Sequence, residues 1–403
     1  MQLRFWFDVV CPFAWIASTQ VEALAAEAGV ELVPQPVLLG GVLQATGAPT
    51  VPMDAMSPAK WRIIRDDAVR QAAARGVAIH WPVDHPQRSV DAMRLVAAAP
   101  PDKQMGVAAD LFQAYWVRGE RVTDAAVLGR VAKSHGLPTD LHTRPEARAA
   151  LFASTEEAVR AGVFGVPTLG VGDELFWGVD RLSAARVALG LPPEPRQDLG
   201  RRGGRVTFFH DFSSPFSYLA SLQIEEVARA AGATIEWVPF LLGALFKQLG
   251  GPLVPISTFS DPKRAWVARD LQRTAAALGA PLRWPSSFPL RTVLPLRVAI
   301  QEPATTACLY HAAWADDRDV GDPEIVKAVL CEAGFDGAAL VQGATEAGPK
   351  AILRENTQRA LSMGACGAPT FVVNDEHLFW GQDRLPLVQA ALTGWRPPVA
   401  SLP

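Results

Sequence analysis

The chain carries two copies of one sequence pattern. Three segments of the first half return in the second half, in the same order and with similar turn and aromatic residues. The matched segments are 8–15 and 211–218, 165–168 and 367–370, and 176–182 and 379–385. The copies lie about 200 residues apart, which is far more than the units of about 20 to 50 residues that stack into solenoids. The chain is therefore predicted to fold as two related domains.

Composition excludes several classes of protein. With 403 residues, 49% of them hydrophobic and 20% charged, the chain is long enough for two packed cores. A net charge of −3 and the lack of a basic run argue against a nucleic-acid partner. No stretch offers the about 18 uninterrupted apolar residues expected of a membrane span.

The N-terminus and the cysteines predict a reduced, cytoplasmic protein. The first residues run directly into a strand pattern and lack the charged and apolar regions of a signal peptide. Cys11, Cys308, Cys331 and Cys366 form no Cys-x-x-Cys pair, so neither a disulfide framework nor a metal site is expected. The last three cysteines are interpreted as structural, although Cys366 lies close to the site expected below.

Each half is predicted to begin with the same strand–helix–strand unit. A short apolar run typical of a buried strand leads to a proline that suits the first turn of a helix, where its missing N–H costs nothing. A glycine suited to a left-handed cap ends the helix. The expected strands are 3–7, 31–37, 206–210 and 234–240, and the expected helices are 12–28 before Gly29 and 215–231 before Gly232.

The remainder of each half is predicted to be a helical block followed by a hairpin and a closing helix. The Ala-rich stretches 57–162 and 261–364 have helical spacing. This order indicates an α/β domain with a helical insertion. Three prolines and three glycines in 192–204 indicate a linker. The predicted domains are thus 1–191 and 205–403.

The two copies differ at their most reactive position, where Cys11 stands in one and Ser214 in the other. Both precede a predicted helix, whose N-terminus favours an anion. The pKa of Cys11 is therefore expected to be lowered, which would allow thiol exchange through a mixed disulfide; a buried, inert cysteine is the alternative. Ser214 offers a hydroxyl donor to a bound anion, or serves only as a helix cap.

The motifs together resemble a known family. Segments 213–218, 241–243 and 379–385, with Lys263, are similar to 2-hydroxychromene-2-carboxylate isomerases and kappa-class glutathione transferases. These proteins belong to the DsbA-like branch of the thioredoxin superfamily. The resemblance covers 204–395 and, more loosely, 2–190. It implies two thioredoxin-like domains, each with a DsbA-like helical insertion.

The resemblance also implies a glutathione site in the second half. Ser214 would hydrogen-bond the glutathione thiolate, and the backbone of Ala368, before a cis-Pro369, would pair with the cysteinyl part. Gln382 and Asp383 would hold the γ-glutamyl end. Lys263 would contact the glycine carboxylate or its surroundings.

In the first half the resemblance implies equivalent roles for Val166, a cis-Pro167 and Asp180. Lys60 stands at the place that matches Lys263, which makes it a second candidate for ligand contact. From the residues alone, ordinary turn prolines, helix N-caps and surface lysines remain alternatives. The family commonly carries Thr-Gly-Asn after its Leu-Leu-Gly loop, and neither half of this chain keeps the Asn.

The implied function is that of a glutathione-dependent isomerase acting on an aromatic-derived unsaturated keto acid through reversible thiolate addition. Glutathione and a small, aromatic substrate are the implied partners. A thiol–disulfide oxidoreductase centred on Cys11 and a non-catalytic tandem scaffold are the alternatives. Relatives are usually dimers of single domains, so the fusion would allow a pseudo-dimer within one chain.

Overall fold

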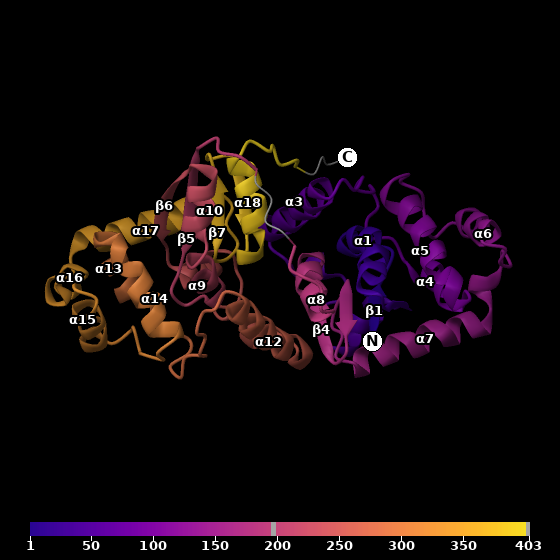
Figure 1. Cartoon of the computed structure of the whole chain (residues 1–403), viewed down its shortest axis with the longest axis horizontal. Helices are drawn as coiled ribbons and strands as arrows, with labels where there is room; N and C mark the ends of the chain where they lie inside the picture. The colour runs from indigo at the N-terminus through magenta and orange to yellow at the C-terminus, as the bar shows by residue number, and fades with distance from the viewer. Residues whose placement is uncertain (195–198, 400–403) are drawn as a thin grey trace.

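The computed structural model describes residues 1–194 and 199–399, which form two domains side by side (Figure 1). Each domain is built on a four-stranded sheet in which the first strand pairs in parallel with the second and antiparallel with the third. The strand order is β2(Glu31–Pro36)-β1(Gln2–Phe7)-β3(Thr168–Val171)-β4(Glu174–Trp177) in the first domain and β6(Thr234–Pro239)-β5(Arg205–His210)-β7(Thr370–Val373)-β8(His377–Trp380) in the second. The predicted α/β class and the two related domains, each with a helical insertion, are confirmed.

Helices cover each sheet and form the insertion between its second and third strands. In the first domain they are α1(Pro12–Ala28), α2(Leu39–Ala45), η1(Pro52–Ala55), α3(Pro58–Ala74), α4(Val90–Ala98), α5(Pro101–Trp116), α6(Ala125–Ser134), η2(Leu141–Thr143), α7(Pro145–Arg160), η3(Val179–Arg181) and α8(Leu182–Ala188). In the second they are α9(Pro215–Ser221), α10(Ile224–Ala231), α11(Leu242–Gln248), η4(Pro255–Thr258), α12(Asp261–Ala277), α13(Val293–Gln301), η5(Pro303–Thr305), α14(Thr306–Trp314), α15(Pro323–Glu332), α16(Gly337–Gly343), α17(Ala347–Ser362), η6(Gln382–Arg384) and α18(Leu385–Leu392). Within the described residues, none of these helices has the length and apolar character needed to cross a bilayer.

The helix that follows the first strand is continuous in one domain and broken in the other. Both begin at the predicted proline and end at the predicted left-handed glycine. The single helix expected over 215–231 is wrong, because α9 and α10 are separate. Gln223 causes the break: its side-chain amide donates to Leu219 O at 3.0 Å, the acceptor its own N–H would use in a continuing helix, and that N–H turns to Ala220 O.

The expected linker lies only partly within the described residues. Residues 192–194 and 199–204 belong to no helix or strand, whereas 195–198 lie outside the description. On either side, α8 ends at Ala188 and β5 begins at Arg205.

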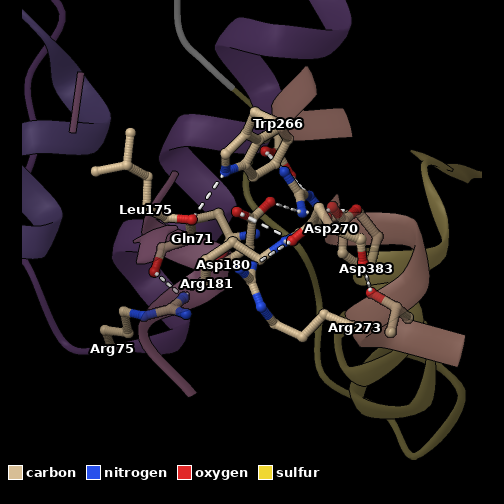
Figure 2. A network of polar contacts seen from close by, with 12 residues as sticks. Gln71, Arg75, Leu175, Asp180, Arg181, Trp266, Asp270, Arg273 and Asp383 are labelled. Atoms are coloured by element: carbon tan, nitrogen blue, oxygen red, sulfur yellow. Dashed lines mark hydrogen bonds and ion pairs between the residues drawn. The ribbon is translucent and has the colours of Figure 1, made fainter. Parts of the chain in front are cut away.

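The two domains meet through a buried ionic network. Arg181, from η3 of the first domain, donates to both carboxylate oxygens of Asp270 on α12 of the second, at 3.0 Å from Nε (Figure 2). Its Nη1 also binds Asp383 of η6 at 3.0 Å. Nearby, the Trp266 indole of α12 donates to Leu175 O of β4 at 3.0 Å. One arginine of the first domain therefore binds two aspartates of the second.

The same contact occurs in the opposite direction. Arg384, the counterpart of Arg181, binds Asp67 on α3 of the first domain through Nε at 2.6 Å and Asp180 of η3 through Nη1 at 2.7 Å. Each domain therefore gives one arginine to the other and receives one from it. The repeated sequence produces a repeated, reciprocal interface.

Candidate functional site

Cys11 and Ser214 occupy equivalent positions, each at the N-cap of a helix and facing a cis-proline loop. The Cys11 thiol lies 3.2 Å from Val166 O, and the Ser214 hydroxyl donates to Ala368 O at 3.0 Å. The Val166-Pro167 and Ala368-Pro369 bonds are both cis, so the predicted cis-prolines are confirmed. The structure thus brings together the predicted helix start and the predicted proline loop in both domains.

Ser214 also caps its helix. Its hydroxyl oxygen accepts from the Ser217 N–H at 3.1 Å, whereas Cys11 makes no side-chain cap bond. The prediction that Ser214 caps the helix is therefore confirmed. The same hydroxyl has a proton that now points to Ala368 O and could turn to an anion bound at the helix N-terminus.

The expectation of a lowered thiol pKa at Cys11 is wrong. Cys11 is only 7% exposed, and burial raises the pKa of its thiol to about 12. The backbone N–H groups of Ala14 and Phe13 act in the opposite direction, but the lost hydration of a thiolate outweighs them. Cys11 therefore stays protonated near neutral pH.

This pKa predicts slow chemistry at Cys11. In the folded protein at about pH 8, we expect Cys11 to react with iodoacetamide at least about tenfold more slowly than after unfolding. Because the folded pKa lies above the ordinary value, the rate should still be rising with pH well beyond pH 9. Mass spectrometry of the labelled peptides measures this, with the exposed Cys331 as the internal control. Equal labelling of Cys11 and Cys331 would contradict the prediction.

The two lysines lie against tryptophans of the opposite domain. Lys60 Nζ is 5.6 Å from the Trp380 ring centroid, and Lys263 Nζ is 5.4 Å from that of Trp177. Trp380 in turn packs on Gly367, next to the Ser214–Ala368 pair. Lys60 therefore lies beside the loop of the second-domain site, whereas Lys263 lies beside Trp177, which packs on Gly165 in the loop of the first-domain site.

Each lysine lies beside a tryptophan of the other domain because α3 and α12, which carry the two lysines, each extend toward the neighbouring domain (Figure 1). Burial lowers the pKa of Lys263 to about 8, and the charge of Lys60 adds to this effect. Neither ammonium group forms an ion pair with any described residue, so both remain available to an anionic ligand.

Asp180 and Asp383 lie in the ionic network instead of capping the last helices. The cap positions of α8 and α18 belong to Arg181 and Arg384, and no side chain caps either helix, so the N-cap interpretation is wrong. Gln382 behaves differently: it is 7% exposed, and its amide makes no hydrogen bond to the described residues. Gln382 belongs to η6, which packs against α9, the helix that Ser214 caps.

Three aromatic side chains pack together beside the cis-proline loop of the first domain. Phe164, two residues before Val166, lies 4.9 Å from Trp177 and 5.8 Å from Trp266, centroid to centroid. Trp177 and Trp266 meet edge to face at 5.4 Å. In the second domain, Cys366 stands in the place of Phe164. The signal for this aromatic cluster in the sequence is the difference between Phe164 and Cys366, which precede otherwise matched segments.

The comparisons with known proteins agree with this architecture. The model of the DsbA-like thioredoxin domain family matches twice, over residues 2–190 and 205–393. A 2-hydroxychromene-2-carboxylate isomerase of Sphingobium xenophagum is 31% identical over 191 residues, which are 46% of this chain and 97% of the relative. Glutathione S-transferase kappa 1 of Caenorhabditis elegans is 26% identical over 46% of this chain and 88% of its own length. A solved 2-hydroxychromene-2-carboxylate isomerase superposes with a TM-score of 0.41 at 24% identity, covering 47% of this chain and 95% of that one.

Proposed function

Because the chain belongs to the family of DsbA-like thioredoxin domains, which it carries twice, we propose that it is a glutathione-dependent isomerase of the 2-hydroxychromene-2-carboxylate isomerase type. We place the working site in the second domain. The observation that carries this proposal is the Ser214 hydroxyl, held at the N-terminus of α9 beside the carbonyl that precedes cis-Pro369.

The residues of this site fit the chemical groups of glutathione. A thiolate needs donors and positive potential, which Ser214 and the start of α9 supply. A carboxylate needs a cation, and Lys60 has no other anionic partner among the described residues. The γ-glutamyl end needs hydrogen-bonding groups, and Gln382 has a free amide. Asp383 binds Arg181 and Arg384, so it would orient that end only as part of the network.

When bound, glutathione would supply a thiolate that adds to the conjugated carbon of an aromatic-derived keto acid, so that the double bond becomes single, rotates, and re-forms as the thiolate leaves. The protein's own residues would lower the energy of the anion and hold the two reactants in place. Ser214 would donate its hydroxyl proton toward the sulfur without giving it up. The reaction needs no other nucleophile and no net proton from the protein.

The first domain supports the site of the second in this proposal. Cys11 is protonated, and Phe164, Trp177 and Trp266 occupy the region beside it. The first domain still contributes Lys60 from α3. The reciprocal arginine contacts support the idea that the two domains act as a pseudo-dimer within one chain.

Calorimetric titration with reduced glutathione tests the proposal. We expect one site per chain, and we expect Lys60→Ala to weaken the affinity about tenfold, since a hydrogen bond to a charged group contributes about 1.5 to 3 kcal/mol. Lys263→Ala is the matched control, because it removes the equivalent lysine from the other side of the interface. Its affinity should equal that of the unaltered protein.

Three results would contradict this assignment. No heat of binding at millimolar glutathione would remove the glutathione-dependent function. Two sites per chain would mean that the first domain also binds. A larger loss with Lys263→Ala than with Lys60→Ala would mean that the lysines are not exchanged between the domains.

A further inference from the structure

The core beneath the Ser214 helix contains three polar side chains, those of His210, Ser217 and Tyr310, at positions that are apolar in the first domain. Each polar residue has an apolar counterpart in the first domain, and two of these pairs follow from the sequence alone. His210 and Phe7 each precede the matched aspartate, and Ser217 and Ala14 each lie three residues after the N-cap residue. The third pair is fixed by geometry. Tyr310 lies four residues before Trp314, and Phe112 lies four residues before Trp116.

Those two tryptophans occupy the same place in each fold. The Trp314 indole donates to Phe212 O at 2.8 Å, and the Trp116 indole donates to Val9 O at 2.9 Å. Both acceptors lie in the loop between the first strand and its helix. Tyr310 in the second domain therefore corresponds to Phe112 in the first.

The three polar side chains of the second domain lie together and are fully enclosed. His210 Nδ1 is 3.1 Å from the Tyr310 hydroxyl, and His210 and Ser217 have no exposed surface. The Ser217 side chain acts on the Tyr310 phenol, opposing the rise in pKa that burial causes there. Among residues 1–194 and 199–399, however, neither His210 Nε2 nor the Ser217 hydroxyl has a hydrogen-bond partner. Such atoms cost stability, and the first domain has no polar atoms in these places.

This polar cluster reaches Ser214 through one residue. The Ser217 N–H donates to the Ser214 hydroxyl oxygen at 3.1 Å, so the residue that holds Ser214 is also the one whose side chain opposes the rise in the Tyr310 pKa. Burial lowers the pKa of His210 to about 3, which keeps the imidazole neutral. With its proton on Nδ1, His210 donates to the Tyr310 oxygen, and the phenol proton is then free to turn toward the unpartnered Ser217 hydroxyl.

We propose that Ser217, Tyr310 and His210 are positioning residues that align their dipoles with the N-terminus of α9 and hold the Ser214 hydroxyl ready for a bound thiolate. This inference rests on the proposed function and adds to it a reason why only one domain works. In this arrangement the Tyr310 proton turns toward Ser217 in the first turn of α9, where its positive charge adds to the field that already favours an anion. The first domain has Phe7, Ala14 and Phe112 in their place, and its N-cap residue lacks a side-chain cap bond.

The test measures the pKa of the glutathione thiol in the complex, by the ultraviolet absorbance of the thiolate as the pH is raised. In the unaltered protein, bound glutathione should titrate below free glutathione. Tyr310→Phe introduces the residue of the first domain, and we expect it to raise the bound thiol pKa by about one unit, a tenfold loss of thiolate. Ser217→Ala, also the first-domain residue, should shift it in the same direction.

Tyr115→Phe is the matched control, since it removes a buried first-domain hydroxyl that bonds His85 and Gln87. The bound thiol pKa should not change in that variant. If Tyr310→Phe and Ser217→Ala both leave a lowered thiol pKa in place, the positioning role is overturned while the proposed function stands. If the unaltered protein binds glutathione with an ordinary thiol pKa, or does not bind it, the proposed function fails and this inference fails with it.

Discussion

Replacing Arg384 with alanine is expected to lower the free energy of unfolding by about 3 kcal/mol, because it leaves the Asp67 carboxylate without its cation and takes one of two arginines from Asp180 and Asp383. Arg384 contacts Asp67, Asp180 and Asp383, and its side chain is only 12% exposed. The lost ion pairs lie at the domain interface. Urea unfolding followed by tryptophan fluorescence should therefore show a lower midpoint concentration of urea. Arg181→Ala should behave in the same way, since its contacts are equivalent.

A surface arginine provides the control for this prediction. Arg318 pairs with Glu332 at the surface of the second domain, and exposed pairs contribute about 1 kcal/mol or less. Arg318→Ala should therefore change the unfolding free energy by no more than that. If Arg384→Ala costs no more than Arg318→Ala, the network does not hold the domains together as described.

The repeat made much of the fold predictable. Pro12 and Pro215 open helices, Gly29 and Gly232 close them, and the two cis-prolines stand where the matched segments placed them. These features depend on local backbone preferences, which a sequence expresses within a few residues. Because the same signals occur twice in the same order, fewer folds are compatible with the sequence.

The assignment of side chains to sites was less predictable, because it depends on how the domains dock. Lys60 and Lys263 each lie on a helix of one domain and face a tryptophan of the other. Asp180 and Asp383 likewise bind arginines from both domains. A repeated sequence shows that such residues are equivalent, but it does not show which of the two sites each residue lies beside.

The pKa of Cys11 could not be predicted for a different reason. The field of a helix N-terminus follows from the chain itself, whereas the loss of hydration around a thiolate depends on every element packed nearby. Burial outweighs the helix at Cys11. The sequence does show one relevant difference between the two copies. The second domain has His210, Cys366 and Gln382, which are more polar, where the first domain has Phe7, Phe164 and Val179. An anion site needs that polarity, which favours Ser214 over Cys11 as the working centre.

Replacing Ser214 with alanine is expected to lower the rate of isomerisation about a hundredfold, since one donor to a developing or bound anion typically contributes a factor of about 10² to 10³. The hydroxyl also caps α9, so the variant should lose about 1 kcal/mol of stability and remain folded. The rate is measured with reduced glutathione and 2-hydroxychromene-2-carboxylate as the test substrate. Ser214→Cys, which introduces the residue of the first domain, should not restore activity, because a neutral buried thiol is a weak donor.

Ser221→Ala separates this role from a general effect on the helix. Ser221 lies at the other end of α9, where its hydroxyl donates to Tyr218 O at 2.7 Å. Losing that bond should change stability by a similar amount and leave the rate within about twofold. A Ser214→Ala rate equal to that of Ser221→Ala would reduce Ser214 to a helix cap and leave the thiolate without its assigned donor. A hundredfold difference between two serines of one short helix would instead assign the chemistry to the hydroxyl that faces cis-Pro369.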